Sequence, residues 1–337
     1  MIEIDGSEGE GGGQVLRTSL ALSIVTGRPF RLFNIRAGRD KPGLGKQHLA
    51  CARAAQQVSN ADVTGDEIGS GDLAFAPQGI YPGKYRFSVG SAGSASLVLQ
   101  TVLYPLLHAD SESHVSVEGG THNAWAPPLD FLQHTFLPVV ARASMQVELR
   151  AERLGFFPAG GGEIHAQIQP WKVRERLKLH ERGVVALAAV AYVANLPENV
   201  GERELGIIGR ALNVSDLRQE RPRGLGPGNA LCVFARGEHV TEVVTAFGKR
   251  GKAAETVAKE AVREMKAYLK SEAPVGEHLA DQLLLPMALG AGGSFTTLKP
   301  TLHTTTNIAT IRRFVDVEID VAEHQGAWRV TVAPKEK

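Results

Sequence analysis

The stretch Gln14–Arg36, with the sequence QVLRTSLALSIVTGRPFRLFNIR, contains the two patterns that indicate the fold class. Apolar residues recur at helical spacing over 15–24, and Gly27 follows as a typical helix stop. Apolar and polar residues then alternate over 30–35, as they do in a strand with one buried face. We therefore predict a helix followed by a strand, with the basic side chain of Arg36 where the strand ends.

The same pattern occurs twice more along the chain. Apolar runs at 97–107 and 283–289 are each followed by a strand-like segment, and a glutamine lies within the first run and directly before the second. A basic residue comes 21 or 22 residues after each glutamine. A chance match stays an alternative, because helix, glycine and strand recur in any α/β protein, but the matched basic side chain favours a true repeat. The three pairs are Gln14 with Arg36, Gln100 with His122, and Gln282 with His303.

Two other segments complete the predicted organisation. A weaker fourth unit starts at the glycine-rich segment 156–162 and continues into an alternating strand over 163–169. Residues 183–273 are typical of a smaller inserted α/β domain, so that 1–182 and 274–337 would form the domain of repeated units. The last helix of this inserted segment has an apolar stripe, which more often packs in the protein's own core than forms a groove for a partner. The elements expected in the insert are strands at 184–194 and 230–236 and helices at 198–212 and 252–270.

The composition argues against a disordered, secreted or membrane-spanning chain. The 337 residues are 43% hydrophobic, and the two cysteines, Cys51 and Cys232, cannot build a disulfide framework. The N-terminus has no signal-peptide pattern, and the longest apolar run, 184–194, is shorter than the ~20 residues of a membrane helix. We expect a cytoplasmic protein with no membrane partner.

The charges are balanced overall but locally clustered. With 37 Lys and Arg against 36 Asp and Glu, the net charge of +1 argues against a general nucleic-acid coat. The densest basic cluster, 36–48, includes Arg36, Arg39 and two lysines directly after a predicted strand. A phosphate-bearing ligand would fit it, because arginine forks match phosphate oxygens, and a solvated basic loop is the alternative. Arg17 on the preceding helix favours the ligand.

Two acids lie in the glycine-rich segment 8–14, EGEGGGQ, ahead of the first helix. The segment lacks the Lys-Ser/Thr pair of a Walker A loop and the spacing of a dinucleotide fingerprint. Glu8 and Glu10 could hold Mg²⁺ together with substrate phosphates. Acids that favour the helix dipole explain them equally well.

His303 lies in a polar segment, 300–307, after a predicted strand. Alone, such a histidine is more often a surface residue than a catalyst. No histidine has the spacing of a zinc motif, and both cysteines lie in apolar segments where a thiol is inert. The pattern around His303 therefore leaves its role open.

Eight short motifs distributed along the chain restrict the choice further. They are GEGGGQ (9–14), IRAGR (35–39), KPGL (41–44), QH (47–48), GSAGSASLVLQTV (90–102), GFFPAGGG (155–162), GEHLADQ (276–282) and LHT (302–304). In order and spacing they resemble the RNA 3′-terminal phosphate cyclase family over nearly the whole chain. This resemblance implies an α/β fold of repeated βαβαββ units around a pseudo-threefold axis, with an inserted smaller α/β domain.

The resemblance also implies an activity and a set of site residues. The activity is the ATP-dependent conversion of an RNA 3′-terminal phosphate into a 2′,3′-cyclic phosphodiester, through AMP on His303 and an RNA(3′)pp(5′)A intermediate. Glu10 matches the acidic residue near the metal, Mg²⁺ or Mn²⁺. Two positions depart from the family pattern, since His278 replaces a frequent Tyr and Leu154 the usual Arg or His. The ATP-contacting positions are Gln100, Pro127, Phe131, His278, Leu279, Ala280, Asp281 and Gln282, and the pocket for phosphates and the RNA end comprises Arg17, Arg36, Arg39, Gln47 and His48.

The expected partners are ATP and an RNA with a 3′-phosphate, and a homodimer is left open. Three alternatives differ in class. A non-catalytic branch of the same family acts in ribosome assembly and lacks the nucleophilic histidine, so the presence of His303 favours the enzyme. An enolpyruvyl-transferase-like enzyme would share a related repeat, and a plain RNA-binding module would consume no ATP.

Overall fold

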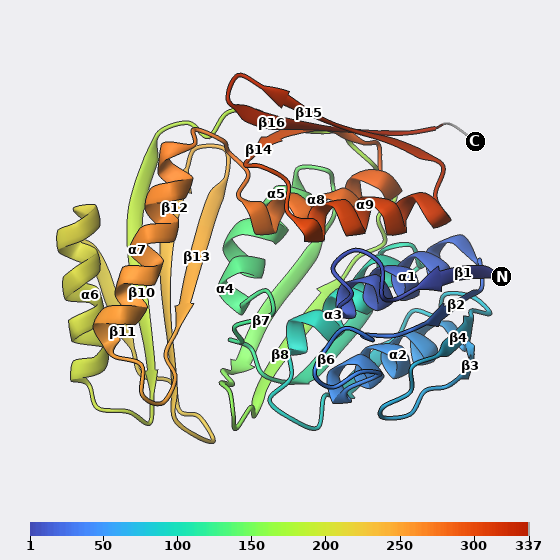
Figure 1. Cartoon of the computed structure of the whole chain (residues 1–337), viewed down its shortest axis with the longest axis horizontal. Coiled ribbons are helices and arrows are strands. Elements are labelled where there is room, and N and C mark those ends of the chain that lie inside the picture. The colour runs from blue at the N-terminus through green and yellow to red at the C-terminus, as the bar shows by residue number, and fades with distance from the viewer. Residues whose placement is uncertain (336–337) are drawn as a thin grey trace.

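The computed structural model describes residues 1–335, which form four four-stranded sheets and their covering helices (Figure 1). Three of the sheets share one topology. In each, the first two strands of the unit are parallel, and the fourth strand lies antiparallel between the second and the third. The predicted repeat of βαβαββ units is therefore confirmed.

The elements of the three units are as follows. The first comprises β1 (Ile2–Asp5), α1 (Gly13–Thr26), β2 (Phe30–Phe33), α2 (Lys46–Ser59), β3 (Asp62–Thr64) and β4 (Leu73–Ala76). The second comprises β5 (Lys84–Ser88), α3 (Ala95–Leu107), β6 (Ser113–Gly119), α4 (Leu129–Phe131), the π-helical turn η1 (Leu132–Phe136), α5 (Leu137–Ala141), β7 (Val147–Arg153) and β8 (Gly162–Ile168). The third comprises β9 (Leu177–Leu179), α8 (Glu277–Leu289), β14 (Gly293–Thr297), α9 (Leu302–Phe314), β15 (Val317–His324) and β16 (Ala327–Pro334).

The helices of the three units pack on one another between their sheets. Helix α1 contacts α2, α3 and α9, and α8 contacts α9 (Figure 1). Their packing explains why α1 is apolar on several faces, since Leu16, Leu20 and Leu22 are all buried. The helix ends where the sequence predicts, at Gly27, whose φ of 68° is left-handed and costs glycine little. The N-terminal ends of α1 and α9 and the start of α8 are thereby brought together.

The predicted fourth unit is wrong. Residues 162–168 form β8, which closes the second sheet by pairing with both β6 and β7. The preceding glycines lie in the loop between β7 and β8. Alternation correctly indicated a strand, but it cannot show which sheet the strand joins, because strand pairing depends on residues far away in the sequence.

The insert comprises β10 (Val185–Ala194), α6 (Asn199–Leu212), β11 (Asp216–Glu220), β12 (Gly228–Gly237), β13 (Thr241–Phe247) and α7 (Ala254–Lys270). Its strands form the fourth sheet, with the order β11-β10-β12-β13. Helices α6 and α7 cover one face in a separate core, where Ala261 and Met265 on the α7 stripe are fully buried. The other face, with Cys232 and Phe234, packs into the main core. The sequence missed β11 and β13, and the domain boundaries at 183 and 273 stay a prediction.

The composition gave expectations about the two cysteines and about a membrane-spanning helix. Cys51 and Cys232 are both free and buried, and burial raises the pKa of each thiol, as expected of inert cysteines. Among residues 1–335, no helix combines the length and the apolar character needed to cross a bilayer.

Candidate active site

Three units contribute helices to the site, and two of them supply a hydrogen-bonded chain that ends on His303. Gln14, in the first turn of α1, donates from Nε2 to the two carboxylate oxygens of Asp281 on α8 at 2.6 and 2.8 Å. The Nδ1 atom of His303, at the start of α9, lies 3.1 Å from Oε1 of Gln14. His303 itself is exposed. The imidazole of His303 is therefore exposed to solvent, while its Nδ1 atom is hydrogen-bonded to Gln14 on the protein side.

This chain determines which nitrogen of His303 carries the proton. An ionised carboxylate only accepts hydrogen bonds, so Gln14 must turn its NH₂ group toward Asp281. Its carbonyl oxygen then faces His303 and can only accept, which places the proton on Nδ1. The Nε2 atom is left with a free lone pair. Such a nitrogen is suited to nucleophilic attack.

Further hydrogen bonds hold this chain in place. Asn307 on α9 donates to the backbone oxygen of Asp281 at 3.0 Å and accepts from Thr18 on α1 at 2.9 Å. Burial raises the pKa of Asp281 above its ordinary value, and the hydrogen bond from Gln14 opposes that shift. Asn307 and Thr18 were not predicted from the sequence, because nothing local marks a polar side chain that joins two helices.

A cationic cluster lies beside the start of α1. A Cβ atom at Gly13 would clash with Nε2 of His48 and lie 2.8 Å from Nη1 of Arg17, so both side chains approach the helix start closely. His48 accepts at Nδ1 from the backbone N–H of Gly45 at 3.1 Å, which leaves its Nε2–H as a donor. Burial and the charges of Arg17 and Arg36 lower the pKa of His48 to about 3, so the ring is neutral at neutral pH.

Arg17 is the residue of this cluster that most clearly lacks a counterion. Within residues 1–335 it makes no hydrogen bond or ion pair, and burial lowers the pKa of its guanidinium. The nearby carboxylates of Asp281 and Glu10 act on it only at longer range. A half-buried guanidinium without a partner is costly unless an anion binds it, so the cluster is a candidate anion site.

Glu10 links the glycine-rich segment to the rest of the site. Its carboxylate forms an ion pair with Arg39, and its backbone N–H donates to Thr306 on α9 at 2.9 Å. Arg36 donates to the backbone oxygen of Gly43 at 2.7 Å. One half-buried carboxylate suffices for Mg²⁺ or Mn²⁺ when substrate phosphates supply other ligands, so Glu10 fits a metal, in competition with Arg39. The structure thus brings together Glu10, Arg17, Arg36, Arg39, His48, Asp281 and His303.

The other predicted residues differ in what they offer a ligand. Gln100 donates to Gln282 at 2.6 Å, so equivalent positions of the second and third units meet. Gln47 accepts from the backbone N–H of Ser94 at 2.7 Å and is turned toward the second unit. The backbone oxygen of Pro127 accepts from Ser96. Side chains of Phe131, Leu279 and Ala280 are at most 2% exposed, whereas His278 is exposed.

His122 is the residue of the second unit that the repeat pattern matches to His303, and its environment is different. His122 is buried and bonds to Asp130 through Nε2 at 2.8 Å, and Asp130 accepts from Tyr192 of the insert at 2.8 Å. Among residues 1–335, the three-residue group with metal-ligand geometry is formed by His122, Asp130 and Cys232, all buried. These hydrogen bonds satisfy the side chains of His122 and Asp130 without a metal ion. Because Tyr192 belongs to the insert, the cluster also joins the second unit to the insert.

The fold and the site define an α/β protein of repeated units with a cationic cluster beside a histidine that has a free nitrogen. Comparison with known proteins makes the assignment specific. The model of the RNA 3′-terminal phosphate cyclase family matches residues 8–321, and the chain belongs to that family.

The chain is similar over nearly its full length to two named relatives. A protein of Koribacter versatilis (strain Ellin345) named RNA 3′-terminal phosphate cyclase is 49% identical over 344 aligned positions, covering 100% of this chain and 96% of that protein. One of the same name from Ralstonia nicotianae (strain ATCC BAA-1114 / GMI1000) is 50% identical, covering 98% and 96%. The enolpyruvyl transferase NikO from Streptomyces tendae is 11% identical with a TM-score of 0.36, covering 98% of this chain and 48% of that chain. That last likeness is too small to bear on function.

Proposed function

We propose that the protein uses ATP to convert the 3′-terminal phosphate of an RNA into a 2′,3′-cyclic phosphodiester. Membership of the cyclase family and the names of the two relatives support this activity. The structural observation that supports this activity is the hydrogen bond between Nδ1 of His303 and Oε1 of Gln14, which leaves Nε2 of His303 free to attack. The presence of this histidine favours an enzyme over a non-catalytic relative.

The first step forms a bond between Nε2 of His303 and the α-phosphorus of ATP, and pyrophosphate leaves. The ring gains positive charge as its lone pair is used. The bond from Nδ1–H to Gln14, with Asp281 behind it, stabilises that charge and holds the ring in line.

The second and third steps move the AMP group and then release it. An oxygen of the RNA 3′-phosphate attacks the phosphorus of AMP, the P–N bond breaks, and Nε2 of His303 regains its lone pair. The neighbouring 2′-OH then attacks the 3′-phosphorus, passes its proton to solvent, and displaces AMP. A DNA end lacks that hydroxyl, so it would stop at the activated stage.

The remaining residues would bind the phosphate groups and the metal. Arg17, Arg36 and the Nε2–H of His48 would hold phosphate oxygens, since in-line displacement at phosphorus depends on positioning and charge neutralisation. A bound divalent metal would neutralise triphosphate charge, with Glu10 as its protein ligand. The ATP would lie over the start of α8, near Gln100 and the segment 278–282.

A 3′-phosphorylated oligoribonucleotide tests the activity directly. Incubation with ATP and Mg²⁺ should make the end resistant to phosphatase, with one ATP converted to AMP per end. The matching oligodeoxyribonucleotide should acquire AMP without cyclising. Conversion without ATP, or ATP consumption that does not track conversion, would refute the proposal.

The proposal places the enzyme where RNA and ATP are available, and we keep the predicted cytoplasmic location with it. A homodimer also stays a prediction. Cell fractionation and light scattering of the purified protein test these two points.

A further inference from the structure

Three large apolar side chains are exposed where the second unit meets the insert. Trp125 is 95% exposed, Phe157 74% and Leu225 73%. An isolated β-bridge between His122 and Phe156 joins the loops that carry Trp125 and Phe157. Leu225, in the loop between β11 and β12, packs against Gly161 of the loop between β7 and β8. The three residues therefore lie on neighbouring loops rather than scattered over the surface.

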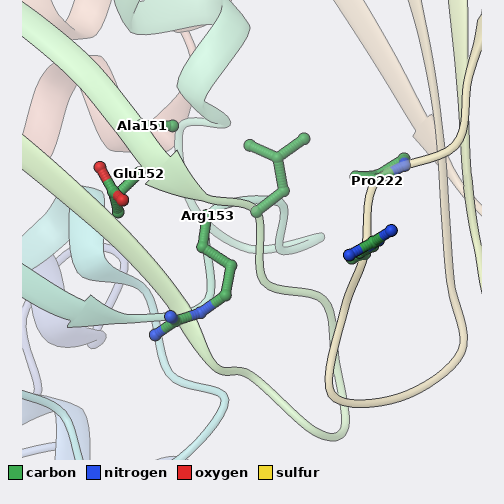
Figure 2. Close-up of a pocket in the computed structure, with 6 residues that line it drawn as sticks. Ala151, Glu152, Arg153 and Pro222 are labelled. Atoms are coloured by element: carbon green, nitrogen blue, oxygen red, sulfur yellow. The ribbon is translucent and has the colours of Figure 1, made fainter.

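A pocket of about 430 Å³ opens beside these loops. Figure 2 shows Pro222 on the β11–β12 loop facing the end of β7, where Arg153 lies, while Glu152 points away from that loop. Arg153 donates to the backbone oxygen of Gly161 at 2.5 Å and has one further nitrogen 3.7 Å from Glu163. Arg223 also lines the pocket, is exposed, and forms no ion pair within residues 1–335. Cationic and apolar groups thus stand side by side.

A continuous set of contacts connects this surface with the anion site. Gln47, next to His48, accepts from the backbone N–H of Ser94. Two residues earlier, Ala92 accepts from the side chain of Asn123 at 2.8 Å, and Gly160 packs closely against Ala92. The segment 91–94 therefore has the cationic cluster on one side and the loops of Trp125 and Phe157 on the other.

We propose that this surface binds the nucleotides that precede the terminal phosphate of a single-stranded RNA. Bases would stack on Trp125 and Phe157, and Arg153 and Arg223 would contact backbone phosphates. The exposed aromatic rings and the arginines lie on one group of neighbouring loops. This favours a single-stranded RNA, because stacking suits every base and cations follow the backbone. The inference rests on the proposed function, since a 3′-terminal phosphate bound at the anion site determines which protein surface the preceding nucleotides of the RNA reach.

RNA length provides the test. A 3′-phosphorylated dinucleotide should engage only the anion site, whereas an RNA of about ten nucleotides should gain about tenfold or more in kcat/KM and in binding affinity. The variants Trp125→Ala and Phe157→Ala should remove most of that gain and leave kcat/KM for the dinucleotide unchanged. Tyr81→Ala is the matched control: Tyr81 is a 47% exposed ring, bonded through its backbone to Val58 at the far end of α2 from His48.

Direct binding of the longer RNA, measured by fluorescence anisotropy, separates this inference from the proposed function. If the protein turns over no RNA but loses affinity for the longer RNA on Trp125→Ala, the surface stands and the proposed activity fails. If the dinucleotide is cyclised and the longer RNA binds wild type and variants alike, the surface inference fails. A variant that changes the oligomeric state in light scattering, with RNA affinity intact, would show that a second copy covers the surface.

Discussion

Gln14 lies between a carboxylate and an imidazole, and each neighbour restricts how the amide can be oriented. Asp281 requires its NH₂ group, so His303 receives its oxygen. The tautomer of the proposed nucleophile is thus fixed by a residue that touches no substrate in the proposed mechanism. Sequence motifs include Gln14, but nothing in the sequence assigned it this positioning role.

Replacing Gln14 with methionine tests this positioning. Gln14→Met keeps the length of the side chain and removes both hydrogen bonds, so we expect transfer of AMP to His303 to slow about ten- to hundredfold. Single-turnover labelling with ATP measures the rate. Because Asp281 would lose a partner, unfolding in urea must be followed in parallel, with a loss of about 1–3 kcal/mol expected. An unchanged labelling rate would contradict the role of Gln14.

Arg17 allows activity and stability to be separated. Its guanidinium is half-buried without an ion pair among residues 1–335, so Arg17→Met should keep or raise the free energy of unfolding. Turnover of a 3′-phosphorylated RNA should fall by about a hundredfold or more, since one phosphate clamp is lost. Urea unfolding and steady-state kinetics on the same preparation measure both effects. A loss of stability that parallels the loss of activity would indicate a structural role.

At the scale of elements, the local patterns were predicted well and the long-range pairings poorly. Helices α1 and α7 agree with the sequence within two residues, because periodicity and caps are local features. The strand β8 was assigned to a separate unit, since its partners β6 and β7 are set by tertiary packing. For the site, the resemblance supplied positions but not side-chain directions. It therefore did not show that Phe131 and two residues of α8 are buried.

The start of α8 is tied to the insert by a buried acid. Glu242 on β13 accepts from the backbone N–H of Gly276, which precedes α8, at 3.3 Å. Burial raises the pKa of Glu242 to about 8, and that of Glu204 on α6 to about 7. Near neutral pH the folded protein therefore holds protons that the unfolded chain releases.

These raised pKa values predict how stability depends on pH. Between the ordinary carboxyl value and about 8 the folded state binds more protons, so the free energy of unfolding should fall as pH rises from 6 to 9. Glu242→Gln removes one such group and should reduce the slope by up to about 1.4 kcal/mol per pH unit. Urea unfolding at several pH values measures it. Parallel curves for wild type and Glu242→Gln would show that Glu242 is not protonated in the folded state.

At the scale of the whole molecule, the three units place their helices around one site while the insert widens the surface next to it. The near-neutral charge of the chain argues against a general nucleic-acid coat. The structure places uncompensated cations locally instead, at Arg17 and Arg223. Few phosphates would then be contacted, and apolar stacking would supply the rest of the affinity.

This balance predicts a shallow salt dependence of RNA binding. With about four phosphate contacts, the slope of log K against log salt should be about −3 for a single strand. Arg223→Ala should reduce its magnitude by about 0.7. Anisotropy titrations over a range of salt concentrations measure the slope. A value twice as steep would reveal a longer basic groove than the one described.

The central claim is that Nε2 of His303 becomes covalently bonded to AMP, and intact mass spectrometry tests it most directly. After incubation with ATP and a divalent metal, without RNA, the wild-type protein should gain the mass of one AMP. That gain should be lost in acid and absent from His303→Asn. An AMP adduct that persists in His303→Asn, or no adduct on a folded wild-type protein that still cyclises RNA, would contradict the account.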